Sequence, residues 1–169
     1  PAHLAKRFFA SLVPFGPSPA AGAWADHRLR PAEASLWRAM PRADRRHSVV
    51  VARRVQRRLG EQATRPVLAA ALLHDVGKTV SRFTTFGRVG ATVVAEVAGH
   101  RRVSGWAGRG GLAGRVGRYA AHPWLGAELL AGVGSDPLTV AWAAEHHLPP
   151  DRWSLPADVA EVLHDADDD

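Results

Sequence analysis

Residues 66–78 read Pro-Val-Leu-Ala-Ala-Ala-Leu-Leu-His-Asp-Val-Gly-Lys. Proline at the start of an apolar run is favoured in the first turn of a helix, so the stretch predicts a buried helix from about Pro66 through His74, with Gly77 near its end. Such a helix would carry His74 and Asp75 into the interior. Because a buried carboxylate without a partner is costly, a cation is a natural partner for Asp75.

The polar residues at the end of this stretch point in different directions. Successive helical residues are about 100° apart, so His74 and Asp75 can approach a site from two sides, and the two oxygens of Asp75 can bridge two metal ions. Lys78 follows His74 by four residues and shares its helical face, where it can pair with a phosphate oxygen. A single His-Asp pair has a second interpretation, a capping aspartate beside a surface histidine, so other residues must support the site.

The rest of the chain favours helices. Apolar residues recur at helical spacing, whereas the alternating pattern typical of strands is scarce. We predict an all-α, single-domain helical bundle, with a main domain over residues 31–169 and a helix-and-loop extension over residues 1–30. The expected helices outside the opening stretch cover residues 31–40, 41–59, 91–98, 112–121, 123–131, 137–147 and 156–167.

The extension and an internal glycine-rich segment are expected to contain loops. We expect a helix over residues 4–12, whose Phe8, Phe9 and Leu12 either cover the core or mediate a homodimer, and a loop over residues 15–22. Residues 99–114 are rich in glycine and arginine and indicate a flexible loop.

Composition restricts the chemistry. The 169 residues include no cysteine, which excludes thiolate-bound metals and leaves nitrogen and oxygen as ligand atoms. A formal net charge of +6 suits an anionic ligand such as a phosphoester, although an arginine-rich solvated surface explains it equally well. The chain lacks a long apolar run and a signal-peptide pattern, so we expect a cytoplasmic protein that binds no membrane, and we expect no nucleic-acid partner.

Further histidines and acids support the site at His74 and Asp75. Taken singly, each is more often a structural residue than a ligand, but several lie at the ends of predicted helices. These residues are His47, His122, the pair His146 and His147, and an aspartate at the end of the last helix. Helical register favours Asp167 as that aspartate, with Asp165 as the alternative.

The order of these residues resembles the HD superfamily of metal-dependent phosphohydrolases, over roughly residues 42–169. His47 matches the first histidine of that family, His74-Asp75 its signature pair, and Asp167 its closing aspartate. The segment His122-Pro123-Trp124-Leu125-Gly126-Ala127-Glu128-Leu129-Leu130 is similar to the HP-x-x-G-x-x-L-L segment of the HD-GYP branch, as is Glu145-His146-His147.

The resemblance implies a bundle of the HD-domain type with two divalent metal ions, iron or manganese before zinc, magnesium or nickel. One ion would bind His47, His74, Asp75 and Asp167, and Asp75 would bridge to a second ion held by His122, His146 and His147. A metal-activated water would cleave a phosphoester, and the expected substrate is nucleotide-like. Asp75 and Lys78 would be catalytic, and substrate contacts are expected from Lys78, Arg101, Arg102 and Arg109.

Other functions of HD proteins stay open at this point. Similar sites that hold a mixed-valent di-iron centre perform oxygenase chemistry, and degenerate relatives are non-catalytic signalling modules. The chain also departs from the HD-GYP pattern, because residues 148–153 read Leu-Pro-Pro-Asp-Arg-Trp where Gly-Tyr-Pro is expected. Ala43 replaces the glutamate that supports a third metal in some members, which favours two metals.

Overall fold

The structure is a computed structural model that describes residues 15–81, 91, 94 and 99–168. Within these residues every regular element is a helix and none is a strand, so the predicted all-α, single-domain fold is confirmed. The α-helices are α2 (Pro19–Asp26), α3 (Pro31–Ala39), α4 (Arg42–Leu59), α5 (Arg65–Leu73), α7 (His100–Ser104), α8 (Gly111–Ala120), α9 (His122–Gly132), α10 (Pro137–Glu145) and α11 (Ala157–Asp168). Three short 3₁₀ helices, η1 (Gly60–Gln62), η2 (Val76–Ser81) and η3 (Pro150–Arg152), lie between them.

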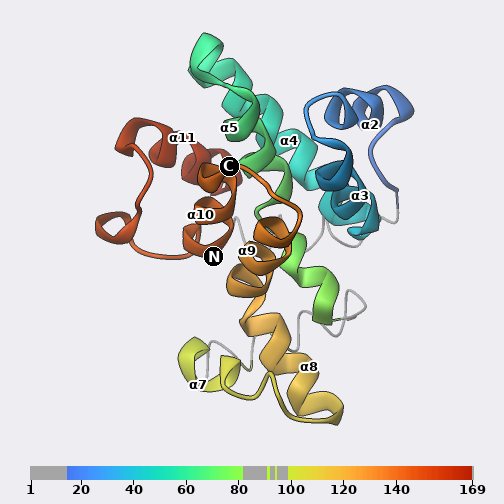
Figure 1. Ribbon diagram of the computed structural model, residues 1–169, viewed down its shortest axis with the longest axis vertical. Helices are drawn as coiled ribbons and strands as arrows, with labels where there is room; N and C mark the ends of the chain where they lie inside the picture. Colours follow the sequence, from blue (N-terminus) through green and yellow to red (C-terminus); the bar gives the residue numbers. More distant parts are fainter. Residues whose placement is uncertain (1–14, 82–90, 92–93, 95–98, 169) are drawn as a thin grey trace.

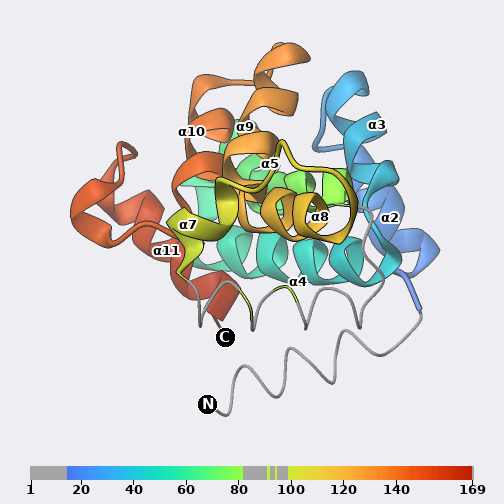
Figure 2. The ribbon, with the colours of Figure 1, turned by 90° about the horizontal axis from the view of Figure 1, so that it is seen from below.

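Helix α5 is the centre of the bundle (Figure 1). Every residue from Val67 to Leu73 is buried, because α5 packs against α3, α4 and α10. Helix α4 runs along one side of the molecule (Figure 2) and packs on α11. The continuous apolar run thus predicted the central helix, since only a helix enclosed by neighbours can bury all of its faces.

A smaller apolar cluster lies beside the main core. Val103 of α7 and Val116 of α8 are buried together with Ala91, and α7 and α8 lie together at one end of the molecule (Figure 1). Helix α8 also packs against η2, the segment that follows Asp75. The α7–α8 unit therefore borders the part of the chain where the site is expected.

Two loop predictions were wrong in part. Residues 99–114 contain α7 and the start of α8, where glycine allows close packing: a Cβ on Gly114 would collide with the carbonyl oxygen of Arg109. Residues 15–22 include the start of α2, where the hydroxyl of Ser18 accepts a hydrogen bond from the Ala21 amide at 3.2 Å. A serine before a proline is a helix-start signal that the loop interpretation overlooked.

Two other helix predictions cannot be compared with the structure. The helix expected over residues 4–12, with its proposed dimer contacts, and most of the helix expected over residues 91–98 fall outside the described residues. Across the described part of the chain, no helix has both the length and the apolar character required to cross a membrane.

Candidate metal centre

The site begins where α5 ends. His74 and Asp75 follow the last residue of α5 and are only 2% and 4% exposed. Their burial follows from the apolar run before them, which places the end of the helix inside the bundle. The sequence prediction that this pair lies in the interior is therefore confirmed.

A first group of donor atoms, the α4–α11 group, joins His47 of α4, His74 and Asp167 of α11. One ligand atom from each lies within 4.8 Å of the others. Nε2 of His47 is 2.6 Å from Oδ1 of Asp167, and Nε2 of His74 is 3.5 Å from the same oxygen. Residues separated by 120 positions thus meet because α11 packs on α4.

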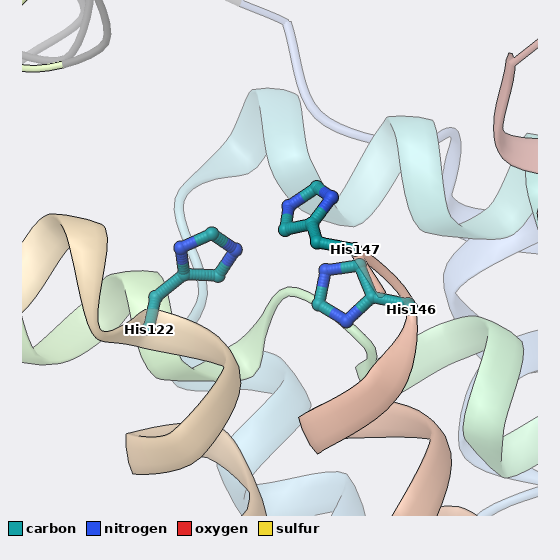
Figure 3. Close-up of side chains that lie close together, drawn as sticks. All are labelled: His122, His146 and His147. Carbon is teal, nitrogen blue, oxygen red and sulfur yellow. The ribbon is translucent and has the colours of Figure 1, made fainter. Parts of the chain in front are cut away.

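A second group, the histidine group, joins His122 at the start of α9 with His146 and His147 just after α10. Figure 3 shows the three rings turned toward one another from these two helices. The ring centroids of His122 and His147 are 5.2 Å apart. His122 and His146 are buried, whereas His147 is exposed, so this group lies at the edge of the interior.

Asp75 lies between the two groups. Its Oδ1 is 3.4 Å from Nε2 of His122 and 3.8 Å from Nε2 of His146. Its Oδ2 is 3.5 Å from Nε2 of His74. Each oxygen of one carboxylate therefore faces a different group, as a bridging ligand requires.

The three buried imidazoles are oriented in the same way. Nδ1 donates to the carbonyl oxygen three residues earlier in each case, from His74 to Ala71 at 3.0 Å, from His122 to Tyr119 at 2.8 Å and from His146 to Ala143 at 3.0 Å. In the neutral form of each ring, these bonds place the proton on Nδ1 and leave the lone pair on Nε2. A histidine that binds a metal commonly donates its other N–H to such an acceptor.

The remaining polar atoms fit a metal. Nε2 of His74, His122 and His146 and Oδ1 of Asp75 are buried, and none has a hydrogen-bond partner among the described residues. Each buried polar atom left unpaired costs about 1–3 kcal/mol. Four such atoms in one place are costly for a purely structural core, whereas a divalent cation can satisfy nitrogen and carboxylate lone pairs together.

Backbone packing fixes the distance between Asp75 and His122. A Cβ on Gly77 would lie 2.0 Å from the carbonyl oxygen of His122 and 2.6 Å from the amide nitrogen of Gly126. Only glycine permits this approach of η2 to α9. The glycine after His74-Asp75 and the glycine after His122-Pro123 thus form one contact, which neither motif reveals by itself.

The two groups differ in charge. Burial lowers the pKa of His74, but the carboxylates of Asp75 and Asp167 outweigh that effect and raise it to about 9. Burial raises the pKa of Asp75, but Lys78 and His74 outweigh it and hold this pKa well below its usual range.

The histidine group is electrostatically different. Burial, with neighbouring cationic groups, lowers the pKa values of His122 and His146. Partial desolvation and the nearby His122 lower the pKa of His147 to about 3, even though part of this ring is open to solvent. All three imidazoles are therefore neutral at pH 7 and able to donate a lone pair.

Lys78 lies next to the bridging carboxylate. Its Nζ is 2.5 Å from Oδ2 of Asp75, and the lysine side chain is 14% exposed. Burial lowers the pKa of Lys78, but Asp75 more than compensates and raises it. The lysine is thus a cation beside Asp75, and the predicted pairing of Lys78 with a phosphate oxygen stays a prediction.

The arginines predicted to bind substrate are less closely tied to the site. Arg102 and Arg109 have exposed side chains, and the guanidinium of Arg109 lies 5.6 Å from the centre of the Trp106 ring in its own segment. The side chain of Arg101 falls outside the described residues. Their role in substrate binding stays a prediction.

The two candidates for the closing aspartate, Asp165 and Asp167, differ in position. Asp165 has a side chain that is 64% exposed and lies 3.9 Å from Arg58, whereas Asp167 contacts His47. Between the two aspartates that the sequence left open, the structure brings only Asp167 into the α4–α11 group.

The turn after the histidine pair contains contacts that the sequence did not predict. The carboxylate of Glu145 accepts hydrogen bonds from the amide and the hydroxyl of Ser154, both at 2.7 Å. The indole of Trp153 donates to the carbonyl oxygen of Leu148 at 3.0 Å. This is the segment that departs from Gly-Tyr-Pro, and these bonds close it into a defined loop. No sequence signal links Glu145 to Ser154, because loop closure depends on the path of the whole segment.

Comparison with known proteins identifies one family. The family model of the HD domain matches residues 46–168, a range that contains both groups and Asp75. No curated protein matches the chain, and no solved structure does.

Proposed function

Because the chain belongs to the HD-domain family, we propose that it is a metal-dependent phosphohydrolase that cleaves a phosphoester at a dinuclear centre. The observation that supports the proposal most strongly is the set of buried atoms without hydrogen bonds around Asp75, described above. In this proposal His47, His74 and Asp167 hold one ion, His122, His146 and His147 hold the other, and Asp75 bridges them. Nitrogen and oxygen ligands in this proportion suit iron or manganese.

Two bound divalent ions would supply Lewis acidity to a phosphoryl oxygen and lower the pKa of a water between them. The chain's own residues prepare this chemistry. The carbonyls of Ala71, Tyr119 and Ala143 fix the three buried imidazoles, so that ligand atoms need little rearrangement. Lys78 adds a positive charge beside Asp75, where it can offset charge that develops on the phosphoryl oxygens.

The finer assignment is also a proposal. The similarity of residues 122–130 and 145–147 to HD-GYP proteins supports a phosphodiester as substrate, of a nucleotide-like kind. The closed loop at residues 148–154 replaces the Gly-Tyr-Pro motif, so we do not extend the specificity of that branch to this chain. A small-molecule substrate in the cytoplasm completes the proposal, and a homodimer through the first residues remains part of it.

A metal and activity assay tests the proposal. We expect the chain purified without metal to bind two equivalents of Mn²⁺ and then to hydrolyse bis-p-nitrophenyl phosphate without oxygen. Asp167→Asn should remove most of the activity, because it replaces a ligand of the α4–α11 group. Asp165→Asn is the matched control, since this exposed carboxylate lies outside both groups, and it should keep the wild-type rate.

Each alternative has its own result. Turnover that requires oxygen and iron would replace the hydrolase proposal with the oxygenase function. A chain that binds no divalent metal would instead be a non-catalytic module. Equal loss of activity in the two aspartate variants would show that the closing ligand is assigned incorrectly.

A further inference from the structure

The last described turn of helix α11 is crowded with carboxylates. Asp165, Asp167 and Asp168 occupy this turn, and it contains no basic residue. Carboxylates this close together repel one another, so a nearby cation stabilises the turn. His164 of the same helix faces Asp168 at 3.5 Å, and a cation on a neighbouring element can help to hold Asp167 in place.

Helix α4 supplies two arginines on the face that carries His47. Arg54 and Arg58 follow His47 by seven and eleven residues, a spacing that places all three on the same side of a helix. Nη1 of Arg54 donates to the carbonyl oxygen of Ala166 at 3.1 Å, and the side chain of Ala166 is fully buried. The arginine thus binds the peptide group that links Ala166 to Asp167.

Arg58 contributes less. Its Nη1 is 3.9 Å from Oδ2 of Asp165, and the two side chains are 40% and 64% exposed. Exposed ion pairs of this kind contribute little to stability. The contact of Arg54 is different, because Arg54 is half-buried and its acceptor is the backbone carbonyl of a fully buried residue.

We propose that Arg54 is a positioning residue for the α4–α11 group. Arg54 holds the last turn of α11 so that the carboxylate of Asp167 meets His47 and His74. The inference rests on the proposed function, because it assigns Arg54 an effect on one of the two metal sites. Arg54 acts through the backbone next to Asp167 and is not itself a ligand. It should therefore influence the α4–α11 group and leave the histidine group, on α9 and α10, unchanged.

Metal titration of Arg54→Met tests the inference. Methionine keeps an apolar stem that can pack as the arginine stem does, but it donates no hydrogen bond. We expect Mn²⁺ affinity at one site to fall 10–100-fold, the range typical for loss of a partner that supports a ligand, and affinity at the other site to stay unchanged. Arg54→Lys should restore most of the affinity, because an ammonium can still donate to the carbonyl.

Arg57→Met is the matched control. Arg57 is an exposed arginine on the same helix, so this variant removes the same charge, and it should bind two Mn²⁺ ions as the wild type does. If Arg54→Met binds both ions with wild-type affinity, the inference is overturned although the proposed function stands. Equal weakening of both sites, or equal weakening in Arg57→Met, overturns it as well, because a general charge or folding effect then suffices.

Hydrogen exchange separates failure of the inference from failure of the proposed function. Without metal, the amides in the last turn of α11 should exchange faster in Arg54→Met than in Arg57→Met, because the turn is released. Equal exchange in the two variants overturns the positioning role whether or not the chain binds metal. A wild type that binds no Mn²⁺ refutes the proposed function, and with it the effect of Arg54 on metal affinity.

Discussion

Gly77→Ala tests the backbone contact that sets the geometry of the site. The added Cβ would lie 2.0 Å from the His122 carbonyl oxygen, whereas side-chain Cβ atoms essentially never approach closer than 3.0 Å. The atom in the way belongs to the backbone, so no side-chain rotation relieves the clash. Helix α9 and η2 must separate by roughly 1 Å, the difference between those two distances.

This separation has a stability cost. Overpacking typically lowers the free energy of unfolding by about 1–3 kcal/mol. A clash with two backbone groups should have a cost at the upper end of this range, about 3 kcal/mol. For a chain of this size each kcal/mol lowers the melting temperature by about 2–4 °C, so Gly77→Ala should melt about 6–12 °C below the wild type.

The same separation alters the metal centre. Ligand distances in metal sites are held to within about 0.2 Å, and His122 would move relative to Asp75 by several times that amount. We expect the affinity of the histidine group for Mn²⁺ to fall about tenfold or more. Calorimetry for melting and a two-site Mn²⁺ titration measure the two effects.

Gly132→Ala provides the control. Gly132 is also in α9, but a Cβ there meets nothing within 4 Å, so this variant should be neutral or slightly stabilising, by up to about 1 kcal/mol. If Gly77→Ala melts within about 2 °C of the wild type and binds both ions normally, the close contact does not exist in the protein and the reasoning is refuted.

Three further predictions concern charge and metal. The pKa of His74 is raised to about 9, so protonated His74 stabilises the metal-free protein fully below pH ~6.5, and this stability is lost as the pH rises toward 9. The melting temperature of the metal-free chain should fall across this interval. The same fall in His74→Gln would contradict the assignment to His74. For the same reason Mn²⁺ affinity at the α4–α11 group should rise by up to tenfold per pH unit below 9. Binding there should release a proton, which calorimetry in buffers of different ionisation enthalpy detects. Binding without proton release would contradict this prediction. Lys78→Met should keep both Mn²⁺ ions but lower kcat/KM for a phosphodiester about 10²-fold, and an unchanged kcat/KM would remove Lys78 from the proposed mechanism.

Local sequence was enough to predict where the His74-Asp75 pair lies. The apolar run of α5 forces His74 and Asp75 into the interior, and the bond from His74 Nδ1 to a carbonyl three residues earlier is a local consequence of the helix. The order of the other histidines suggested the remaining donors through resemblance to a family, and their roles stay predictions. The burial of His74 and Asp75 was predictable because burial and the helical repeat are properties of short segments.

Contacts between distant segments were not predictable in the same way. The approach of Gly77 to His122 depends on how η2 meets α9, and the bond of Arg54 to Ala166 on how α11 lies on α4. Residues 99–114 show the same limit, because Gly114 serves close packing where glycine content alone indicated a loop. A glycine permits both a flexible loop and a tight helix contact, and only the partner segment decides between them.

If both groups bind metal as proposed, the charge difference between them predicts the order in which the ions would bind. The histidine group offers three neutral imidazoles, so an ion can bind there without displacing a proton, but only the shared Asp75 supplies negative charge. The α4–α11 group adds the carboxylate of Asp167, which attracts a cation more strongly, yet the raised pKa of His74 means that a proton occupies this place first. At low pH the histidine group should therefore load first, and as the pH rises the α4–α11 group should gain affinity until its extra carboxylate gives it the advantage.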